Sequence, residues 1–220
     1  AAAAAPWDHL LALTAQGSET RVNTTTTSAQ TLTSYGGGNV AMDSSGNYVV
    51  VWNDANSNAG DVVFQRFDAA GNALGSNTVV NTTTAGLQSE ANVAMNASGG
   101  FVVVWASSGQ DGSGTGVYGQ RFDAGGVAQG SEFRVNASTT GNQTLAAVGM
   151  ASDGSFVVAF TEYNTTSGDI IVQRYDASAN AVGINVRVNT TTTNIQEHAS
   201  IAVNASGSFV VVWESEAQDG

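Results

Sequence analysis

Acidic side chains are the groups in this sequence whose types and spacing could support chemistry. Many fall in stretches rich in Asp, Asn, Gly and Ser, at residues 54–61, 110–116 and 218–220. Oxygen ligands on a glycine-containing loop suit Ca²⁺, although none of these stretches has the ligand spacing of an EF-hand loop. Ordinary turn formation explains the same residues, so both interpretations stay open. The candidate calcium ligands are Asp54, Asp61, Asp111, Asp169 and Asp219.

Pairs of carboxylates also catalyse the hydrolysis of glycosides. Glu162, Glu214 and Glu216, together with Asp169 and Asp219, fall in stretches that we expect to form loops. No apolar residue beside them indicates a pocket that would raise a carboxyl pKa. The sequence therefore favours solvated loop acids, and a glycosidase would require two of these carboxylates close together in one pocket.

Histidine chemistry has little support in the pattern. The chain has two histidines, His9 and His198, at unrelated positions. A Ser-His-Asp triad needs its histidine close to both partners. His198 follows Glu197, but the other repeats described below hold no histidine at the corresponding position. We interpret both as surface or loop histidines, and we predict no catalytic residue and no organic cofactor.

These residues sit in a chain that repeats itself about every 55 residues. A Gly-x-x-x-x-Val-Asn phrase occurs four times, and its glycines lie 58, 55 and 53 residues apart. A second phrase ends in a large aromatic residue, and a third reads Gln-Arg-aromatic-Asp. The repeats span residues 17–74, 75–129, 130–182 and, incompletely, 183–220, after an N-terminal cap or linker at 1–16. The recurring aromatic residues are Trp52, Trp105, Phe160 and Trp213.

Each repeat is predicted to form a meander of four short antiparallel strands. The valine-rich run before each aromatic residue, such as Phe101–Trp105, is apolar on both faces, as a strand covered on both sides should be. Turns such as 43–46 and 96–99 contain Asp or Asn with Ser and Gly, which favour tight hairpins. Short turns require antiparallel neighbours.

Four such meanders indicate an all-β chain, and we expect a β-propeller of four-stranded antiparallel blades. A β-solenoid is the alternative, but the hairpin turns count against its parallel stacking. The last repeat lacks a third strand, and Arg21–Asn23 could supply the fourth strand of a closing blade. We expect a fragment of a longer protein, or a neighbouring chain that completes the sheet.

The connections that vary in length, after strands two and four, should lie on one face of the propeller. Because loops on a rigid scaffold carry function, we expect that face to bind the ligand. Its candidate residues are Tyr35, Gln110, Glu162, Tyr163 and Glu214.

Composition excludes several classes of function. The chain has 220 residues, a net charge of −12 and 11% charged residues. Without a basic stripe it is not expected to bind nucleic acid, and no apolar run is long enough for a membrane span. It has no cysteine, so no disulfide framework is predicted. Residues 6–13 look like a short helix that begins at a proline.

The segment from Phe101 to Asp123 resembles repeats of large secreted bacterial surface proteins, many exported by type I systems. The resemblance covers residues 17–220. It implies an extracellular, cell-surface setting and a propeller-like, non-catalytic module that adheres to a protein or glycan. We therefore predict a structural or adhesive module and no enzyme. The alternative is a carbohydrate-binding, lectin-like propeller, and a glycosidase is a further one.

Overall fold

The computed structural model describes residues 19–24, 29–32, 38–55, 60–165 and 167–216. In these ranges the chain is all-β and contains no helix, so no described helix could cross a membrane. The predicted cap at 1–16 and its short helix, with Tyr35 and Asp219, lie outside the described residues.

The strands are β1 (Gln30–Thr31), β2 (Val40–Met42), β3 (Tyr48–Asp54), β4 (Asp61–Phe67), β5 (Ala73–Val79), β6 (Gln88–Met95), β7 (Phe101–Ser108), β8 (Thr115–Phe122), β9 (Phe133–Arg134), β10 (Asn142–Met150), β11 (Phe156–Tyr163), β12 (Gly168–Tyr175), β13 (Ala181–Arg187), β14 (Gln196–Val203) and β15 (Phe209–Ser215).

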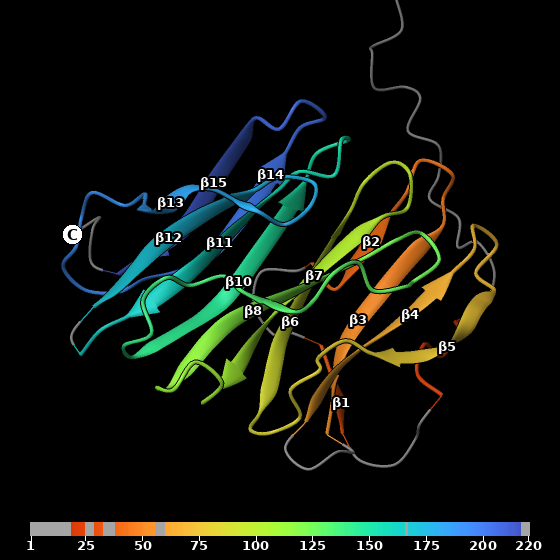
Figure 1. Cartoon of the computed structure of the whole chain (residues 1–220), viewed down its shortest axis with the longest axis horizontal. Coiled ribbons are helices and arrows are strands. Elements are labelled where there is room, and N and C mark those ends of the chain that lie inside the picture. The colour runs from red at the N-terminus through yellow and green to blue at the C-terminus, as the bar shows by residue number, and fades with distance from the viewer. Residues whose placement is uncertain (1–18, 25–28, 33–37, 56–59, 166, 217–220) are drawn as a thin grey trace, which may run out of the picture.

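The sheets of successive repeats follow one another around the molecule in chain order (Figure 1). Each sheet takes its fourth strand from the opening phrase of the following repeat, so from here on a repeat is counted as one sheet. Repeat one is then β2–β5, repeat two β6–β9 and repeat three β10–β13, each an antiparallel meander. Repeat four contributes the hairpin β14–β15. The predicted four-stranded meander is thus confirmed in three repeats.

Local chemistry explains the hairpins that join the first two strands of each repeat. In repeat one, the Asp43 carboxylate accepts hydrogen bonds from the backbone N–H groups of Ser45 and Asn47, at 2.8 and 2.9 Å. Gly46 has a φ of 85°, a conformation that glycine adopts without steric cost. Asn96 and Asn204 make the same pair of bonds in repeats two and four.

Successive sheets pack face to face, and alternate residues of each second strand enter different cores. Trp105 and Val103 of β7 pack with Val51 of β3, whereas Val104 of β7 packs with Val158 of β11. We call the side of a sheet that packs on the preceding repeat its leading face, and the opposite side its trailing face. The recurring large aromatic residue packs between neighbouring sheets, because Trp105, Phe160 and Trp213 all lie on leading faces.

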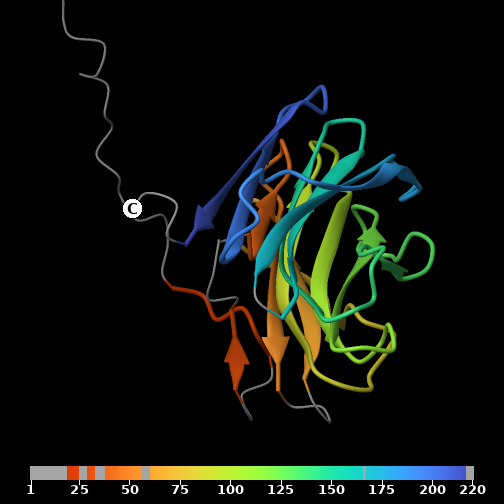
Figure 2. The ribbon, with the colours of Figure 1, turned by 90° about the vertical axis from the view of Figure 1, so that its left-hand side faces the viewer.

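The sheets do not close into a ring. β14 packs on β10, β11 and β12, and the described residues show no packed interface between β14–β15 and β2–β5. Figure 2 shows β15 as the outermost strand at this end of the array. The propeller-like arrangement of sheets is present, but a closed four-bladed propeller is not confirmed.

The first strand of repeats two, three and four contains a bulge. Pairing with the second strand shifts between Ser89 and Asn92 in β6, and at the equivalent points of β10 and β14. A non-glycine residue with positive φ occupies each bulge: Glu90 at 57°, Leu145 at 55° and His198 at 54°. In repeat one the strand is divided here into β1 and β2, so the longer connection of that repeat enters at the bulge.

Candidate functional site

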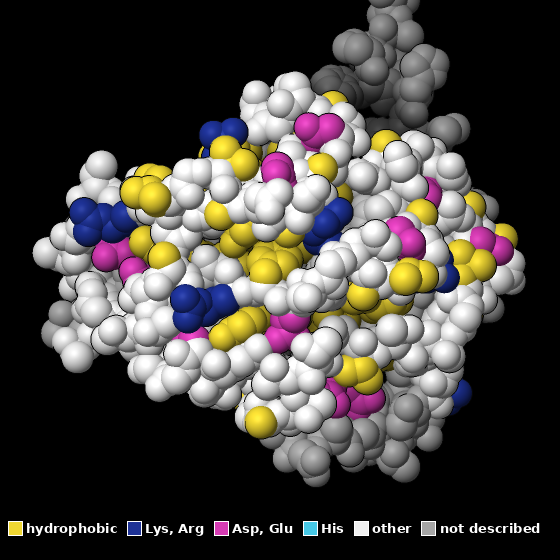
Figure 3. Space-filling view, viewed as in Figure 1, with side chains coloured by type: hydrophobic (Ala, Val, Ile, Leu, Met, Phe, Trp, Pro, Cys, Tyr) yellow, Lys and Arg dark blue, Asp and Glu magenta, His cyan; other side chains and the backbone are white. Residues whose placement is uncertain are grey.

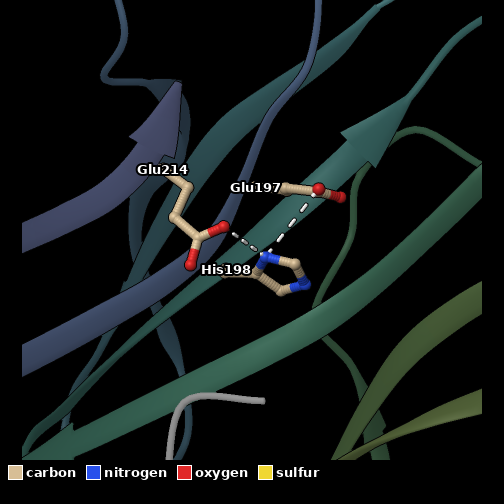
Figure 4. A group of neighbouring side chains, drawn as sticks. All are labelled: Glu197, His198 and Glu214. Carbon is tan, nitrogen blue, oxygen red and sulfur yellow. Dashed lines mark hydrogen bonds and ion pairs between the residues drawn. The ribbon is translucent and has the colours of Figure 1, made fainter. Parts of the chain in front are cut away.

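Three side chains of repeat four converge at the bulge of β14 (Figure 4). Glu197 and His198 come from β14 and Glu214 from β15. The His198 Nδ1 atom lies 3.0 Å from a Glu214 carboxylate oxygen and 3.8 Å from a Glu197 carboxylate oxygen. One ligand atom from each residue lies within 4.8 Å of the others. This is the one group of three or more acidic or histidine side chains at such distances in the described part of the chain.

The bulge explains how two consecutive residues join one cluster. In a regular strand, neighbouring side chains point to opposite faces of the sheet. The extra residue of a bulge breaks this alternation and redirects a side chain. At a φ of 54°, His198 can therefore lie beside both its neighbour Glu197 and Glu214 on the paired strand.

Tyr163, the last residue of β11, connects this cluster to repeat three. Its hydroxyl donates a hydrogen bond to the Glu197 carboxylate. Burial raises the Tyr163 pKa well above its usual value, and the hydrogen bond to Glu197 and the charges of Glu197 and Glu90 raise it further. Tyr163 therefore stays protonated and holds Glu197 in place.

Tyr163 and Glu197, which contact each other, each line a different hollow. The larger, of about 470 Å³, is lined by Tyr163, Glu162 and mainly hydroxyl and amide side chains. The smaller, of about 330 Å³, is lined by Glu197, Glu214 and Glu216 with Ile195 and Ser215. The remaining residues of the larger hollow are Ser138, Thr140, Gly141, Asn142, Asn164, Thr165 and Asp169.

The candidate calcium ligands in the described residues do not converge on one site. Asp61 and Asp169 occupy equivalent places in β4 and β12, whereas Asp111 lies in the turn before β8, and each accepts a hydrogen bond from a Val-Asn asparagine, at 2.7, 2.7 and 3.0 Å. Asp54 lies opposite Asp61 in the β3–β4 pair. Calcium binding stays a prediction. Asp61, Asp111 and Asp169 also have a structural role, because each holds an asparagine side chain in place.

The predicted ligand-face residues are partly brought together. Glu162 and Tyr163 line the larger hollow and Glu214 belongs to the cluster, whereas Gln110 donates a hydrogen bond to Glu132 in repeat two. The expectation that these acids lie in loops was wrong. Glu162, Asp169 and Glu214 lie at strand ends, because the second and third strands of each sheet extend beyond the phrases that recur in the sequence.

The dismissal of His198 as a surface or loop histidine was also wrong, since it lies in β14 with 15% of its side chain exposed. The missed signal was its departure from the repeat. Where repeat four has Glu197, repeats two and three have Ser89 and Thr144, and where it has Glu214 they have Ala106 and Thr161. Repeat four alone has a histidine between two glutamates at these three positions.

Comparison with known proteins supports the fold. No family model matches the chain, and no curated protein matches it. Among solved structures, it resembles a protein of unknown function from Dyadobacter fermentans, with a TM-score of 0.55 and 11% identity over 85% of this chain and 65% of that one. An endo-arabinase from Bacteroides thetaiotaomicron gives a TM-score of 0.48 and 13% identity over 79% and 68% of the two chains. The polysaccharide lyase Uly1 gives 0.48 and 11% over 81% and 49%.

These neighbours correct two predictions. A xylanase and an exo-arabinanase are similar as well, so the neighbours with a named activity are carbohydrate-active enzymes. The predictions of a non-catalytic structural or adhesive module and of no enzyme are therefore wrong, and the carbohydrate-binding alternative agrees better. Identities this low establish the fold alone, so the chemistry must be argued from the cluster. The resemblance to secreted surface-protein repeats gains no support from the family search.

Proposed function

We propose that this chain is a carbohydrate-active, propeller-like domain that binds a glycan across the two hollows and hydrolyses a glycosidic bond at Glu197 and Glu214. One observation carries the proposal: the Glu197 and Glu214 carboxylates approach within 4.8 Å of one another, and both residues line the smaller hollow. Enzymes that retain the anomeric configuration hold their carboxyl groups about 5–5.5 Å apart. The spacing therefore supports a retaining mechanism.

The surroundings of the two carboxylates suggest different roles. The Tyr163 hydroxyl donates a hydrogen bond to Glu197 and orients this carboxylate for attack as the nucleophile. Glu214 would act as general acid and give a proton to the leaving oxygen as the anomeric carbon–oxygen bond breaks and a bond to Glu197 forms. Water then hydrolyses this intermediate while Glu214 takes back a proton. His198, 3.0 Å from Glu214, would position that carboxyl group.

Charge favours a neutral glycan as substrate. The chain carries a net charge of −12, and Glu162, Glu197, Glu214 and Glu216 line the hollows. An anionic polysaccharide would be repelled by this field. On the face drawn in Figure 3, charged side chains are scattered among uncharged ones, without a basic stripe to bind polyanions. We place the activity outside the cell, where polymeric glycans are accessible.

The test is the release of reducing ends from neutral polysaccharides, with arabinan and xylan among them and a uronate polymer for comparison. Glu197→Gln and Glu214→Gln should each lower kcat at least about a hundredfold. Glu19→Gln is the matched control, because Glu19 is exposed and lies outside the cluster. The absence of reducing ends from every neutral polymer would exclude hydrolysis.

A second candidate, glycan binding without cleavage, is favoured by the hydroxyl- and amide-rich lining of the larger hollow. Affinity electrophoresis in the same polysaccharides separates the two. A lectin-like domain would be retarded but release no product, and Glu214→Gln would leave its retardation unchanged. Loss of both retardation and cleavage across all glycans would contradict both candidates.

A further inference from the structure

The carboxylates of Glu197 and Glu214 differ from the acidic side chains that support the backbone. Glu90, at the bulge of repeat two, accepts a hydrogen bond at 2.7 Å from the Leu145 N–H and so joins two neighbouring sheets. Within the described part of the chain, Glu197 and Glu214 accept hydrogen bonds only from the side chains of Tyr163 and His198. The two glutamates therefore have no such structural role there.

The bulge that carries the cluster is a general feature of these sheets, whereas the cluster is not. Repeats two and three contain the same bulge, with Glu90 and Leu145 at positive φ. The positions of Glu197 and Glu214 in repeat four are Ser and Ala in repeat two and Thr in both places in repeat three. The bulge thus forms without this set of side chains, so the fold does not require them.

The three side chains have nearly the spacing of a metal site (Figure 4). Zn²⁺ lies about 2.1 Å from its nitrogen and oxygen ligands, and tetrahedral geometry then sets the ligand atoms about 3.4 Å apart. The His198 Nδ1 atom lies 3.0 Å from Glu214 Oε2 and 3.8 Å from Glu197 Oε1. One ligand atom of each residue lies within 4.8 Å of the others. The Glu214 side chain is 74% exposed, so it can rotate to close the remaining distance.

Tyr163 orients one of these ligands from outside the cluster. Its hydroxyl donates a hydrogen bond to Glu197 Oε2, and the other oxygen, Oε1, is directed toward His198 Nδ1. Metal ligands in proteins are commonly oriented by such outer hydrogen bonds. The contact therefore leaves Glu197 Oε1 placed to bind an ion.

The donor set and the charge of the site favour one class of ion. Zn²⁺ and similar transition-metal ions bind imidazole nitrogen together with carboxylate oxygen, whereas Ca²⁺ takes about six to eight oxygen ligands. Two ionised carboxylates and a neutral imidazole balance the charge of a divalent ion. The net charge of −12, and Glu216 in the same hollow of about 330 Å³, attract cations to this place.

We propose that Glu197 Oε1, His198 Nδ1 and Glu214 Oε2 bind a divalent transition-metal ion of the zinc class, and that this ion inhibits the domain. Three protein ligands would leave the fourth position to water. The bound ion would occupy the oxygen with which Glu197 attacks and the oxygen through which Glu214 transfers its proton. The inhibition rests on the proposed hydrolysis, whereas the binding of the ion does not.

Binding is tested by calorimetric titration of the metal-free full chain with Zn²⁺. The wild type should bind Zn²⁺ at the cluster, and Glu214→Gln and His198→Gln should each raise the dissociation constant at least about tenfold, because even changes outside the ligand set cost about 10–100-fold. Glu216→Gln is the matched control, since it makes the same change of charge in the same hollow outside the cluster. His9→Gln removes the other histidine of the chain and should also leave the cluster's affinity unchanged. Circular dichroism checks that each variant is folded.

Failure of the titration separates this inference from the proposed function. No Zn²⁺ binding, an affinity that survives both cluster substitutions, or controls as disruptive as the cluster variants would overturn the metal site. Ca²⁺ that displaces Zn²⁺ at equal concentration would overturn the assigned class of ion.

Inhibition is measured on whichever neutral polysaccharide the wild type cleaves. Zn²⁺ at about ten times its dissociation constant should lower the rate about tenfold by mass action, and a chelator should restore it. An unchanged or faster rate with Zn²⁺ bound would overturn the inhibitory role. A chain that binds Zn²⁺ at the cluster but cleaves no glycan, even after chelation, would confirm the metal site and refute the hydrolysis.

Discussion

Tyr163 links repeats three and four through one hydrogen bond, and its titration should be visible in the stability of the protein. Its pKa is raised in the folded state, so folded protein binds more protons than unfolded protein above pH 10, the ordinary Tyr value. Stability must therefore fall as pH rises past 10. Tyr163→Phe should reduce this alkaline loss in urea titrations, while burial of Tyr118 and Tyr175 leaves a residual slope. An unchanged alkaline slope would contradict the raised pKa.

The same substitution tests the role of Tyr163 in holding Glu197. Loss of a hydrogen bond to a carboxylate should cost about 1–2 kcal/mol of unfolding free energy at neutral pH. If Glu197 is the nucleophile, kcat should fall while KM changes little, because the hollows keep their shape. A rise in KM with kcat intact would instead indicate that Tyr163 binds the glycan directly.

At the scale of the element, the Val-Asn asparagine ties the fourth strand to the third. The Asn136 side chain accepts from the Val117 N–H at 2.8 Å and donates to Asp111, Gln143 and the Ser138 carbonyl. Asn136→Ala would leave buried partners unsatisfied, so we expect a loss of about 2–4 kcal/mol in unfolding free energy. Ser131→Ala, at an exposed position, is the control and should change stability little. If both variants changed the unfolding free energy equally in denaturant titrations, Asn136 would have no special role in joining the two strands.

The hairpin turns predict how stability responds to acid. Hydrogen bonds from Asn72, its side chain first, lower the pKa of Asp68 below its ordinary value of 3.8, and Asp43 and Asp176 are held in the same way. A lowered folded pKa stabilises the protein above pH 3.8, and this contribution disappears as pH falls through the folded value. Asp68→Asn should therefore flatten the acid limb of a stability–pH curve. If the acid side of the curve were unchanged in Asp68→Asn, the turn would bind the protonated and ionised forms of the Asp68 carboxyl equally well.

Elements were predictable from this sequence where the signal is local. The Val-rich strand at Phe101–Trp105 and the turn at Asp43 carry their periodicity and turn chemistry in a few consecutive residues. The bulges were not predictable, because two of the three residues at positive φ, Glu90 and Leu145, are not of types that favour this conformation. The cluster depends on that bulge, on the β14–β15 register and on Tyr163 from another repeat. No window of the sequence contains all three.

At the scale of the molecule, an array of sheets should be least stable where a sheet has one neighbour. Interior sheets are covered on both faces, whereas β14–β15 packs on repeat three alone. In repeat arrays, stability is the sum of each unit and its interfaces with neighbours. Opening of β14–β15 should therefore precede global unfolding.

A pair of tryptophan substitutions tests this gradient. Trp105 is completely buried between repeats one and two and donates to Gln88 at 3.0 Å, so Trp105→Ala should cost about 3–5 kcal/mol. Trp213, its half-buried counterpart in repeat four, should cost less than half as much when replaced by alanine. Hydrogen exchange should be faster in β14–β15 than in β7. Equal costs with uniform exchange would mean that the terminal sheet is as firmly held as the interior ones.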